Sequence, residues 1–586
     1  MSSVSGGRTI DFESLLRDIR SREGYAGQIH NLSVLPARVA RYADLGLELH
    51  PTVQGILDGL GIERLYAHQV EAIEASLSGE DVVVVSGTAS GKTLCYVVPL
   101  AQHIYERPAS RALLIYPTKA LAQDQLRKLA EFGAGEAFHA ATYDGDTPRK
   151  QRRRIKRECQ VVLTNPDMLH LGILPYHHTW ADFFRNLEYV VLDEVHTYRG
   201  VFGSHTANVI RRLRRIAAKY GANPRFVACS ATIGNPGELF EELTGLPVRV
   251  IDEDGAPRGR RFFMMWDPPV VKRETGQRRS ANLEAAELLC EMVRRGVRCI
   301  VFVLARRVAE LILRYAREQL EEDGLADRVM AYRGGYLPAE RREIERRLFD
   351  GELLGVISTT ALEVGVDIGG LDAAILTGYP GSIASVWQQI GRAGRGQEDS
   401  LAALVTLPGG VHRYLLEHPE YLLGQEVERA RLDPRNRYIL AGHLACATYE
   451  QPLEDADAAL FGDEMEDILS ILADPDARED SHLPYVAKRT RWYWVDPDIY
   501  PAAEINLRST AGQSYDIVLE SGARLGTVDA DSALRTVHEG AIYLHAGESY
   551  IVEGLDLERR VATVRKTRAR YHTEPMIASR MPAMEW

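Results

Sequence analysis

Short apolar runs alternate with longer amphipathic stretches over much of this chain. Five of these runs lie in the first half, at Val82–Ser86, Ala112–Pro117, Val161–Asn165, Tyr189–Asp193 and Phe226–Thr232. Five more follow the polar segment Asp252–Gly259, at Cys299–Val303, Val329–Tyr332, Gly355–Thr359, Ala373–Leu376 and Ala403–Leu407. Continuous apolar runs of this length are typical of parallel strands that helices cover on both faces. The pattern predicts an α/β protein with two tandem, doubly wound parallel-sheet domains joined at Asp252–Gly259.

The two ends of the chain have different patterns. Residues 1–50 are mixed and polar, and we expect helices near Asp11–Arg22 and Pro36–Leu45, where proline suits the first turn of a helix. From residue 501 on, apolar and polar positions alternate between glycine turns, as in a small antiparallel β domain. The predicted division is 1–50 as an N-terminal helical extension, 51–252 and 260–425 as the two α/β domains, 426–500 as a helical or winged-helix-like module, and 501–586 as a small β-barrel-like domain.

Composition and charge add a few limits. The chain has 586 residues, and several domains are expected because single hydrophobic cores stop growing near ~250–300 residues. A net charge of −12 argues against binding of nucleic acid through overall positive charge, but leaves a local basic groove open. Six scattered cysteines without a C-x-x-C pair favour a reduced, cytoplasmic protein over a four-cysteine zinc protein. We expect no signal peptide, and no apolar run reaches the ~20 residues that span a membrane.

A candidate phosphate site follows the first apolar run. The octapeptide Ser86-Gly87-Thr88-Ala89-Ser90-Gly91-Lys92-Thr93 links that run to the segment Leu94–Leu100, which can form a helix. A strand, a glycine-containing loop and a helix N-terminus form a cradle for phosphate, in which Lys92 would reach the β- and γ-phosphates and Thr93 would bind Mg²⁺. The general pattern has Gly where this chain has Ser86, and in this respect the octapeptide resembles the phosphate loop of superfamily 2 helicases. We therefore predict that residues 87–93 bind ATP.

Two carboxylates stand where a metal ion would lie. Asp193 and Glu194 end the run Tyr189–Leu192, and ligands of open α/β sheets bind at the carboxyl ends of strands. Asp193 would hold Mg²⁺ directly or through water, while Glu194 would share the metal site and polarise the attacking water. The predicted cofactors are therefore ATP and Mg²⁺.

The second half of the chain supplies positive charge for phosphoryl transfer. Residues 388–395 have the pattern Q-x-x-G-R-x-G-R, and Gln388, Arg392 and Arg395 would reach the γ-phosphate when the domains close. An arginine delivered in this way is worth ~10³–10⁵ in rate where it is known. By resemblance to the helicases, residues 359–367 form motif V, with Gly365 and Asp367 at the nucleotide and Thr359 at a nucleic-acid phosphate. Gln69 stands where many of these enzymes place a glutamine that reads adenine.

Contacts to nucleic acid are predicted at other strand ends. By the same resemblance, motif Ia contains Pro117, Thr118 and Lys119, and motif Ib contains Thr164, Asn165 and Pro166. Short polar side chains and backbone amides at these positions would hold successive phosphates of one strand. Ser230 and Thr232 belong to a Ser-Ala-Thr motif that would couple the nucleotide site to the nucleic-acid groove.

Three further features each allow two interpretations. The basic runs Arg149–Arg157 and Arg211–Arg215 would extend the nucleic-acid surface or are solvated helix faces. Lys488–Trp494 mixes cations with aromatic rings, as single-strand-binding proteins do, and it equally suits the last strand of a winged-helix module. His443 and Cys446 have helical spacing, but two potential ligands do not make a metal site, and core packing is favoured.

With these motifs in order, residues 65–396 resemble the superfamily 2 helicases. Further stretches narrow the resemblance to DEXH helicases of the YprA/MrfA (mitomycin repair factor) type, distant relatives of the RecQ-like repair helicases. These stretches are Tyr143–Thr147, Ser382–Gln388, Asn436–Leu440 with His443-Leu444, and Val537–His545. The resemblance implies two RecA-like domains and an ATP-driven 3′→5′ DNA translocase in DNA damage repair. The expected partner is single-stranded DNA or DNA with a single-stranded tail, bound by a monomer that associates with the nucleoid.

Two alternatives remain open at this point. Members of that family usually continue into a module with a four-cysteine metal cluster, which we expect this chain to lack. The chain would then be an ATP-controlled module that clamps or remodels DNA without separating strands. The other alternative is an RNA helicase of the DEAH kind, which RNA would stimulate more strongly than DNA.

Overall fold

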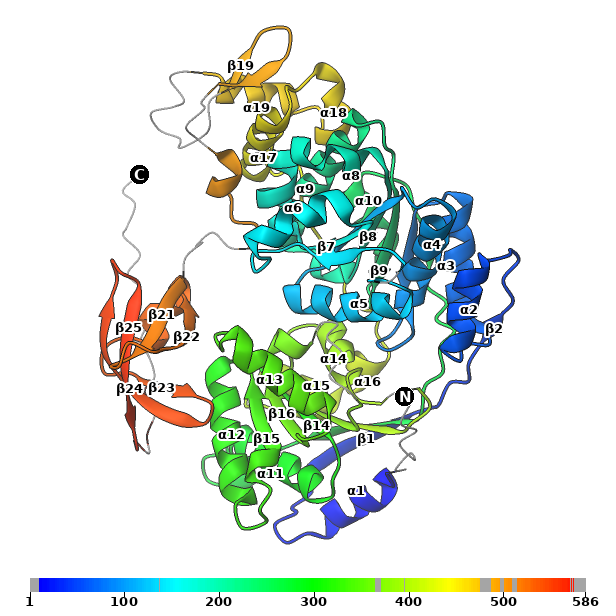
Figure 1. The fold of residues 1–586 in the computed structure, drawn as a ribbon. Helices are drawn as coiled ribbons and strands as arrows, with labels where there is room; N and C mark the ends of the chain where they lie inside the picture. The colour runs from blue at the N-terminus through cyan, green and yellow to red at the C-terminus, as the bar shows by residue number, and fades with distance from the viewer. Residues whose placement is uncertain are drawn as a thin grey trace.

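Figure 1 shows the fold of the chain. The structure is a computed structural model, and it describes residues 10–135, 137–363, 370–394, 396–474, 486–495, 500–508, 514–569, 571 and 573. Two α/β domains lie one above the other. A helical module lies on the outer side of the first domain, and a small β domain lies beside the second (Figure 1).

The first domain is built on seven parallel strands in the order β10-β4-β9-β8-β5-β7-β6. All five predicted runs form strands of this sheet, and its core strands are buried, as in β4, where all four valines are inaccessible. Two three-residue strands, β6 and β10, went unpredicted because they are short and half-exposed. The strands are β4 (Val82–Val85), β5 (Arg111–Ile115), β6 (Ala140–Thr142), β7 (Val161–Thr164), β8 (Leu187–Leu192), β9 (Arg225–Ser230) and β10 (Arg249–Ile251). The helices are α2 (Pro51–Gly59), α3 (Ala67–Ser78), α4 (Lys92–Glu106), α5 (Lys119–Glu131), α6 (Arg149–Glu158), α7 (Pro166–Met168), α8 (Ala181–Arg185), α9 (Gly200–Lys219) and α10 (Pro236–Thr244), with the short turns η1 (Leu169–Ile173), η2 (Leu174–Trp180) and η3 (Val195–Thr197).

The second domain has a sheet of seven strands in the order β1-β11-β18-β17-β14-β16-β15. All neighbouring pairs are parallel except β1 and β11. The strands are β1 (Ile29–Leu35), β11 (Arg261–Trp266), β14 (Cys299–Val303), β15 (Val329–Tyr332), β16 (Gly355–Ser358), β17 (Ala373–Thr377) and β18 (Ser400–Val405), and a hairpin of β12 (Val270–Lys272) and β13 (Gln277–Arg278) lies outside the sheet. The helices are α1 (Phe12–Ser21), α11 (Ala281–Arg294), α12 (Arg306–Leu320), α13 (Pro338–Phe349), α14 (Ile383–Ile390), α15 (Gly410–Glu417) and α16 (Glu420–Leu423), with the turns η4 (Ala326–Arg328) and η5 (Thr360–Leu362).

The N-terminal fifty residues do not form the helical extension that the sequence predicts. Helix α1 is present, but the predicted helix Pro36–Leu45 is wrong, because this segment is extended and contains the two-residue strand β2 (Tyr42–Ala43), which pairs with β3 (Leu65–Tyr66). Strand β1 adds to the edge of the second sheet, and Phe12 and Ile19 of α1 are buried in the same core. Strand β1 thus pairs with β11, more than two hundred residues away, and β2 pairs with β3, and local propensity does not indicate such non-local pairing.

Two chain segments cross side by side between the domains. Arg38 and Arg258 exchange backbone hydrogen bonds of 2.7 and 2.9 Å, and the Arg41 amide donates to the Gly255 carbonyl at 2.9 Å. The segment that connects β10 to β11 therefore forms a two-stranded ribbon with the N-terminal segment. Such a ribbon restrains the relative motion of the domains more than one extended strand would.

Within its described residues, the helical module has three helices and a hairpin. They are α17 (Arg437–Glu450), α18 (Ala458–Phe461), α19 (Met465–Leu472), β19 (Val486–Lys488) and β20 (Trp492–Trp494), with the turns η6 (Asp455–Asp457) and η7 (Pro501–Glu504). Trp492 is 3% exposed and belongs to the core of the module, so its ring packs inside as in the last strand of a winged-helix module. Lys488 lies over that ring at 5.0 Å and pairs with Glu466.

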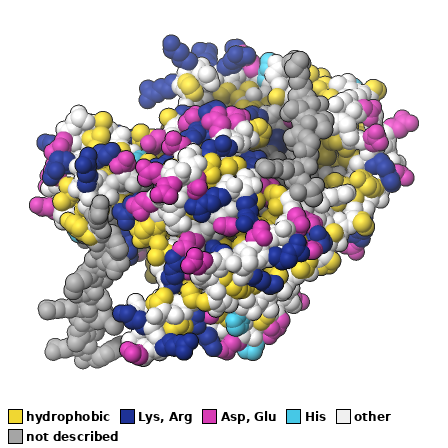
Figure 2. All heavy atoms as spheres, turned by 90° about the horizontal axis from the view of Figure 1, so that it is seen from below, with side chains coloured by type: hydrophobic (Ala, Val, Ile, Leu, Met, Phe, Trp, Pro, Cys, Tyr) yellow, Lys and Arg dark blue, Asp and Glu magenta, His cyan; other side chains and the backbone are white. Residues whose placement is uncertain are grey.

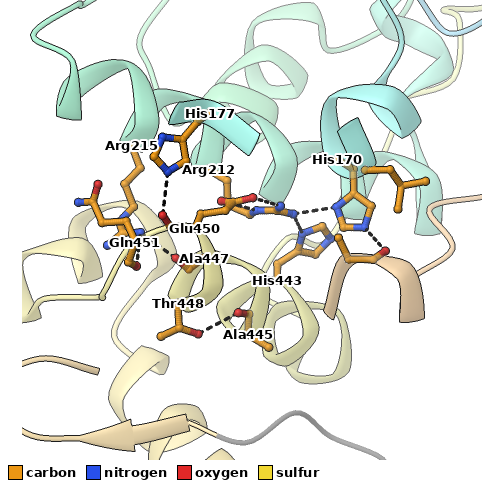
Figure 3. A network of polar contacts seen from close by, with 12 residues as sticks. His170, His177, Arg212, Arg215, His443, Ala445, Ala447, Thr448, Glu450 and Gln451 are labelled. Atoms are coloured by element: carbon orange, nitrogen blue, oxygen red, sulfur yellow. Dashed lines mark hydrogen bonds and ion pairs between the residues drawn. The ribbon is translucent and has the colours of Figure 1, made fainter. Parts of the chain in front are cut away.

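A buried polar network fixes this module to the first domain (Figure 3). Arg212 of α9 is fully buried and binds the carboxylate of Glu450 on α17. Its Nη1 also donates to the Nδ1 atoms of His170, at 2.8 Å, and His443, at 3.1 Å. Arg215 pairs with Asp457 at 2.8 Å. Two arginines of the basic run Arg211–Arg215 are thus neither solvated nor part of a nucleic-acid surface, because the neighbouring module covers them.

The C-terminal β domain is a five-stranded sheet in the order β22-β21-β25-β24-β23. Its elements are β21 (Ser514–Leu519), β22 (Arg524–Asp529), α21 (Ala530–Thr536), β23 (Ile542–His545), β24 (Glu548–Asp556) and β25 (Val561–Thr567). The prediction of a purely antiparallel, barrel-like domain is wrong, because β21 and β25 are parallel and the sheet is open. The crossover from β22 to β23 through α21 makes the parallel pairing possible. Buried Arg333 of the second domain anchors the β domain by donating to the Leu544 carbonyl at 2.8 Å.

Charged side chains are mixed on the surface. In the view of Figure 2, Lys and Arg side chains lie among Asp and Glu side chains and do not form one continuous basic field. This agrees with the net charge of −12. Over the part of the chain that the structure describes, no helix has both the length and the apolar character to cross a membrane.

Candidate functional site

The phosphate loop joins β4 to α4 as the sequence predicts. Lys92 opens the helix, and its Nζ donates to the carbonyls of Ser86, at 2.9 Å, and Gly87, at 3.1 Å. The loop bends through left-handed backbone at Ala89 and Gly91. Ser86 has a role that glycine could not fill, since its hydroxyl lies 2.6 Å from that of Ser90. Lys92 must leave its loop carbonyls to reach a phosphate.

The carboxylates lie opposite this loop, at the end of β8. Asp193 and Glu194 are largely buried, and Glu194 has a left-handed backbone with φ of 52°, which is unfavourable for a residue with a Cβ. Burial, and then the charge of Glu194, raise the pKa of Asp193 to about 7. Burial alone would raise the pKa of Glu194, but His196, Lys92 and Arg392 lower it. Glu194 therefore loses its proton at a lower pH than Asp193 does.

The second domain contributes the other wall of the cleft. The guanidinium of Arg392 donates to the Glu363 carbonyl at 2.7 and 3.2 Å, and the neighbouring Gln389 amide donates to the Glu363 carboxylate at 3.0 Å. The domains touch directly where the Thr88 hydroxyl donates to the Gly391 carbonyl at 2.6 Å. Three predicted residues of this wall, Gly365, Asp367 and Arg395, lie outside the described residues.

These groups line one cavity of about 410 Å³. Its walls include Lys92, Thr93, Asp193 and Glu194 from the first domain, and Gln388 and Arg392 from the second. The Thr93 hydroxyl donates to Gln125 at 3.3 Å at the edge of the cavity. A cation, two carboxylates and an arginine from separate domains thus converge on one space.

Gln69 lies against the phosphate loop. Its Oε1 accepts from the Tyr66 amide at 2.9 Å and its Nε2 donates to the Gly91 carbonyl at 3.0 Å. The side chain is 2% exposed and ties the start of α3 to the loop. Contact of this amide with an adenine ring stays a prediction.

The Ser-Ala-Thr motif contacts the carboxylate motif through its backbone. The Ala231 amide donates to the Nδ1 atom of His196 at 3.1 Å, and His196 lies 3.5 Å from the Glu194 carboxylate. Burial lowers the pKa of His196 to about 4, so the imidazole is neutral near pH 7. Ser230 is fully buried and its hydroxyl donates to the Ala231 carbonyl, whereas Thr232 is exposed. The sequence pattern predicts coupling through the two hydroxyl residues; a role for His196 was not predicted, although this residue lies within the Asp-Glu-Val-His motif.

Motif Ib differs from its prediction. Thr164 is 1% exposed and its hydroxyl donates to the Tyr143 carbonyl at 2.8 Å. Asn165 caps α7 by accepting from the Met168 amide at 2.8 Å, and Pro166 is buried. The Thr164 and Asn165 side chains are thus engaged in hydrogen bonds within the fold, and contact of this motif with a phosphate stays a prediction. In motif Ia, by contrast, Thr118 and Lys119 are exposed and Pro117 is buried.

Arg508 joins the two motifs and was missed from the sequence. Its Nη2 donates to the Pro117 carbonyl at 2.6 Å and to the Asp167 carboxylate at 2.8 Å. The guanidinium also lies 4.3 Å from the centre of the Phe202 ring. No local signal marks this residue, since it follows the helical module and lies more than three hundred positions from its partners.

Comparison with known proteins identifies this constellation. The model for DEAD/DEAH box helicases matches residues 66–239, and the model for the helicase conserved C-terminal domain matches residues 284–397. The ATP-dependent helicase YprA of Bacillus subtilis (strain 168) is 43% identical over 97% of this chain. The chain belongs to the superfamily 2 helicases of the YprA/MrfA type. As a member of this family it is an ATP-dependent helicase, and its α/β domains are the two RecA-like domains of the family.

Two other relatives extend the comparison. The ATP-dependent helicase hrq1 of Schizosaccharomyces pombe is 36% identical over 97% of this chain. A crystal structure of the DUF1998 helicase MrfA bound to DNA has a TM-score of 0.89 over 97% of this chain, at 43% identity. The winged-helix model of ATP-dependent helicase HRQ1 matches residues 432–510, which confirms a winged-helix module. This chain covers 75% of the length of YprA and 54% of the length of the yeast relative.

Proposed function

We propose that this helicase couples ATP hydrolysis to movement along single-stranded DNA. The observation that carries the proposal is the cavity in which Lys92, Asp193 and Glu194 of one RecA-like domain face Arg392 of the other. A site assembled from both domains hydrolyses ATP only when they close, and cycles of closing and opening move the two domains along a bound strand.

The roles follow from position and charge. Residues 87–93 hold the phosphates through loop amides and Lys92, and Glu194, the more acidic carboxylate, accepts a proton from the attacking water. Arg392, with Gln388 beside it and Arg395 from the same motif, stabilises charge on the transferring phosphoryl group. Gln69 reads the adenine edge, and Gly365 and Asp367 complete the nucleotide site. His196 carries the state of Glu194 to Ala231 and so couples hydrolysis to the Ser230–Thr232 motif.

The donor set fits a Mg²⁺ ion. Asp193 and Glu194 lie in one buried cavity with the Thr93 hydroxyl, and all three offer the hard oxygen atoms that Mg²⁺ prefers. Burial and the neighbouring negative charge raise the pKa of Asp193 to about 7, which indicates that positive charge is lacking there. Bound Mg²⁺ would supply that charge and neutralise the phosphate oxygens.

The choice of DNA rests on the relatives. MrfA has been solved bound to DNA and bound to DNA and AMPPNP, and it aligns with 97% of this chain. We therefore infer that single-stranded DNA, or DNA with a single-stranded tail, binds across Thr118, Lys119 and Thr359. The 3′→5′ polarity, a role in DNA damage repair, action as a monomer and association with the nucleoid stay proposals drawn from the family resemblance.

Glu194→Gln tests the mechanism. The amide keeps the size of the side chain but cannot accept the proton, so kcat for ATP hydrolysis should fall by ~10²–10⁴ while nucleotide binding persists. Glu188→Gln, on the same strand but outside the cavity, is the matched control. Unchanged hydrolysis in Glu194→Gln would contradict the assigned role. Hydrolysis without displacement of a paired strand would indicate that this chain clamps or remodels DNA without separating strands.

A further inference from the structure

A second large cavity lies between the second RecA-like domain and the C-terminal β domain. Its volume is about 580 Å³, larger than the 410 Å³ of the cavity that holds the phosphate loop. Three segments form most of its lining, namely the start of α12, the stretch from the end of β22 through α21, and β23, and Arg333 and Thr573 complete it. Cavities of this size are typical of ligand sites, and this one takes no part in the ATP mechanism.

The lining is strongly positive. It contains Arg306, Arg307, Arg333 and Arg535 but only one carboxylate, that of Asp529. Arg306 pairs with Asp529 at 3.2 Å, and Arg333 pairs with buried Glu310 at 2.7 Å. Arg535 is exposed and makes no hydrogen bond or ion pair with another residue within the described ranges. Its guanidinium is therefore available to an anion that enters the cavity.

The remaining lining offers an apolar and aromatic surface. Val308, Ile542 and Leu544 line the cavity together with the ring of Tyr543. The Tyr543 hydroxyl accepts from Arg333 Nη2 at 3.2 Å, which fixes the ring. A positioned aromatic ring beside the exposed guanidinium of Arg535 suits a nucleotide, in which a flat base accompanies a phosphate.

The cavity begins beside a predicted nucleic-acid contact. Strands β14 and β16 are parallel neighbours, with Phe302 opposite Ser358. The segment Ala305–Arg306, which follows β14, and Thr359, which follows β16, thus leave the same edge of the sheet. A strand held at Thr359 would have the cavity next to it.

We propose that this cavity binds a nucleotide unit of the translocated DNA strand, with Arg535 on its phosphate and Tyr543 against its base. The C-terminal β domain then forms part of the nucleic-acid surface, and its docking through Arg333 keeps it in register with the second RecA-like domain. The inference rests on the proposed function, because it presupposes that Thr359 contacts the strand.

The test is binding of fluorescent oligo-dT by anisotropy at several salt concentrations, with Arg535→Gln and the control Arg559→Gln. Arg559 lies on the same β domain with its side chain 86% exposed, and it does not line the cavity. Loss of one phosphate contact should reduce the slope of log affinity against log salt by about 0.7 and weaken binding roughly three- to tenfold. The control should match the wild type. Equal slopes for Arg535→Gln and Arg559→Gln would overturn the proposal.

A second measurement reads the contact directly. Single-stranded DNA containing photoreactive iodouracil should cross-link to the peptide that carries Tyr543, and Tyr543→Leu should remove that product. A purely structural role for Tyr543 gives no cross-link at all. If Arg535→Gln weakens binding of polyglutamate but not of oligo-dT, the cavity docks an acidic protein segment and the proposal fails. A wild-type protein that binds no oligo-dT would instead refute the proposed function itself.

Discussion

The buried pair of Arg212 and Glu450 gives a quantitative prediction about how the winged-helix module is held. Both side chains are at most 1% exposed, and two hydrogen bonds join them (Figure 3). Burial alone would lower the pKa of Arg212, but the carboxylate of Glu450 raises it, so the arginine keeps its charge. Removal of either partner alone leaves the other charge buried and uncompensated.

The expected cost follows from that geometry. Breaking a buried ion pair by removal of one partner costs about 3–5 kcal/mol, whereas removal of both charges avoids this penalty. Arg212→Met and Glu450→Gln should therefore each weaken docking of α17 by about that amount. The double variant should lose less than the sum of the two, although His170 and His443 then lack the donor they share.

Hydrogen exchange at the amides of α17 is the assay, because it reports opening of the module separately from unfolding of the whole chain. Since 1.4 kcal/mol is a factor of ten, a loss of about 3–5 kcal/mol should make each single variant exchange roughly 10² to 4 × 10³ times faster there. Arg346→Met, in an exposed ion-pair cluster on α13, is the control and should leave α17 unchanged. Strictly additive effects of the two single changes would refute the reasoning.

Three further predictions concern the cleft, the interface and the nucleic-acid motifs. Gly391→Ala would place a Cβ 2.5 Å from the Thr88 hydroxyl, so the rate of ATP hydrolysis should fall by about 10²-fold. Gly410→Ala, which has open space around its Cβ, is the control and should leave the rate unchanged. Equal rates for the two variants would contradict a role for the Thr88–Gly391 contact in domain closure. Burial, then Arg212, lower the pKa of His170 and His443 well below the usual value, so the unfolded chain binds more protons below about pH 6.5. The free energy of unfolding should therefore fall as pH drops from 7.5 to 5.5. In His443→Gln, the melting temperature should depend less steeply on pH than in the wild type; a steeper dependence would exclude the buried histidines as the cause. Arg508→Gln leaves the Asp167 charge unpaired beside motif Ia, so oligo-dT binding should weaken relative to Arg559→Gln, and unchanged affinity would exclude a role for Arg508 there.

The sequence predicts best what local pattern determines. All ten apolar runs became strands of the two sheets, and the phosphate loop and the Asp193-Glu194 pair share one cavity. Periodicity and motif spacing suffice for these features, because each element and its catalytic residue are adjacent in the chain.

What the sequence could not predict depends on distant partners. Strand β1 joins a sheet whose other strands begin at Arg261, and Arg212 is buried by a module that starts after residue 430. Thr164 fits its motif, yet its hydroxyl donates a hydrogen bond to the Tyr143 carbonyl. Residue type alone does not show which side chains the packing leaves free. The roles of individual site residues and the domain limits stay predictions.

Steady-state ATP hydrolysis at fixed low salt shows whether binding of single-stranded DNA drives the ATPase. It compares no polymer, single-stranded DNA, duplex DNA and single-stranded RNA. Single-stranded DNA should stimulate hydrolysis more strongly than the other three conditions, because a bound strand favours the closed cleft in which Arg392 faces Lys92 and Glu194. Equal or greater stimulation by RNA, or no stimulation by any polymer, would contradict this prediction.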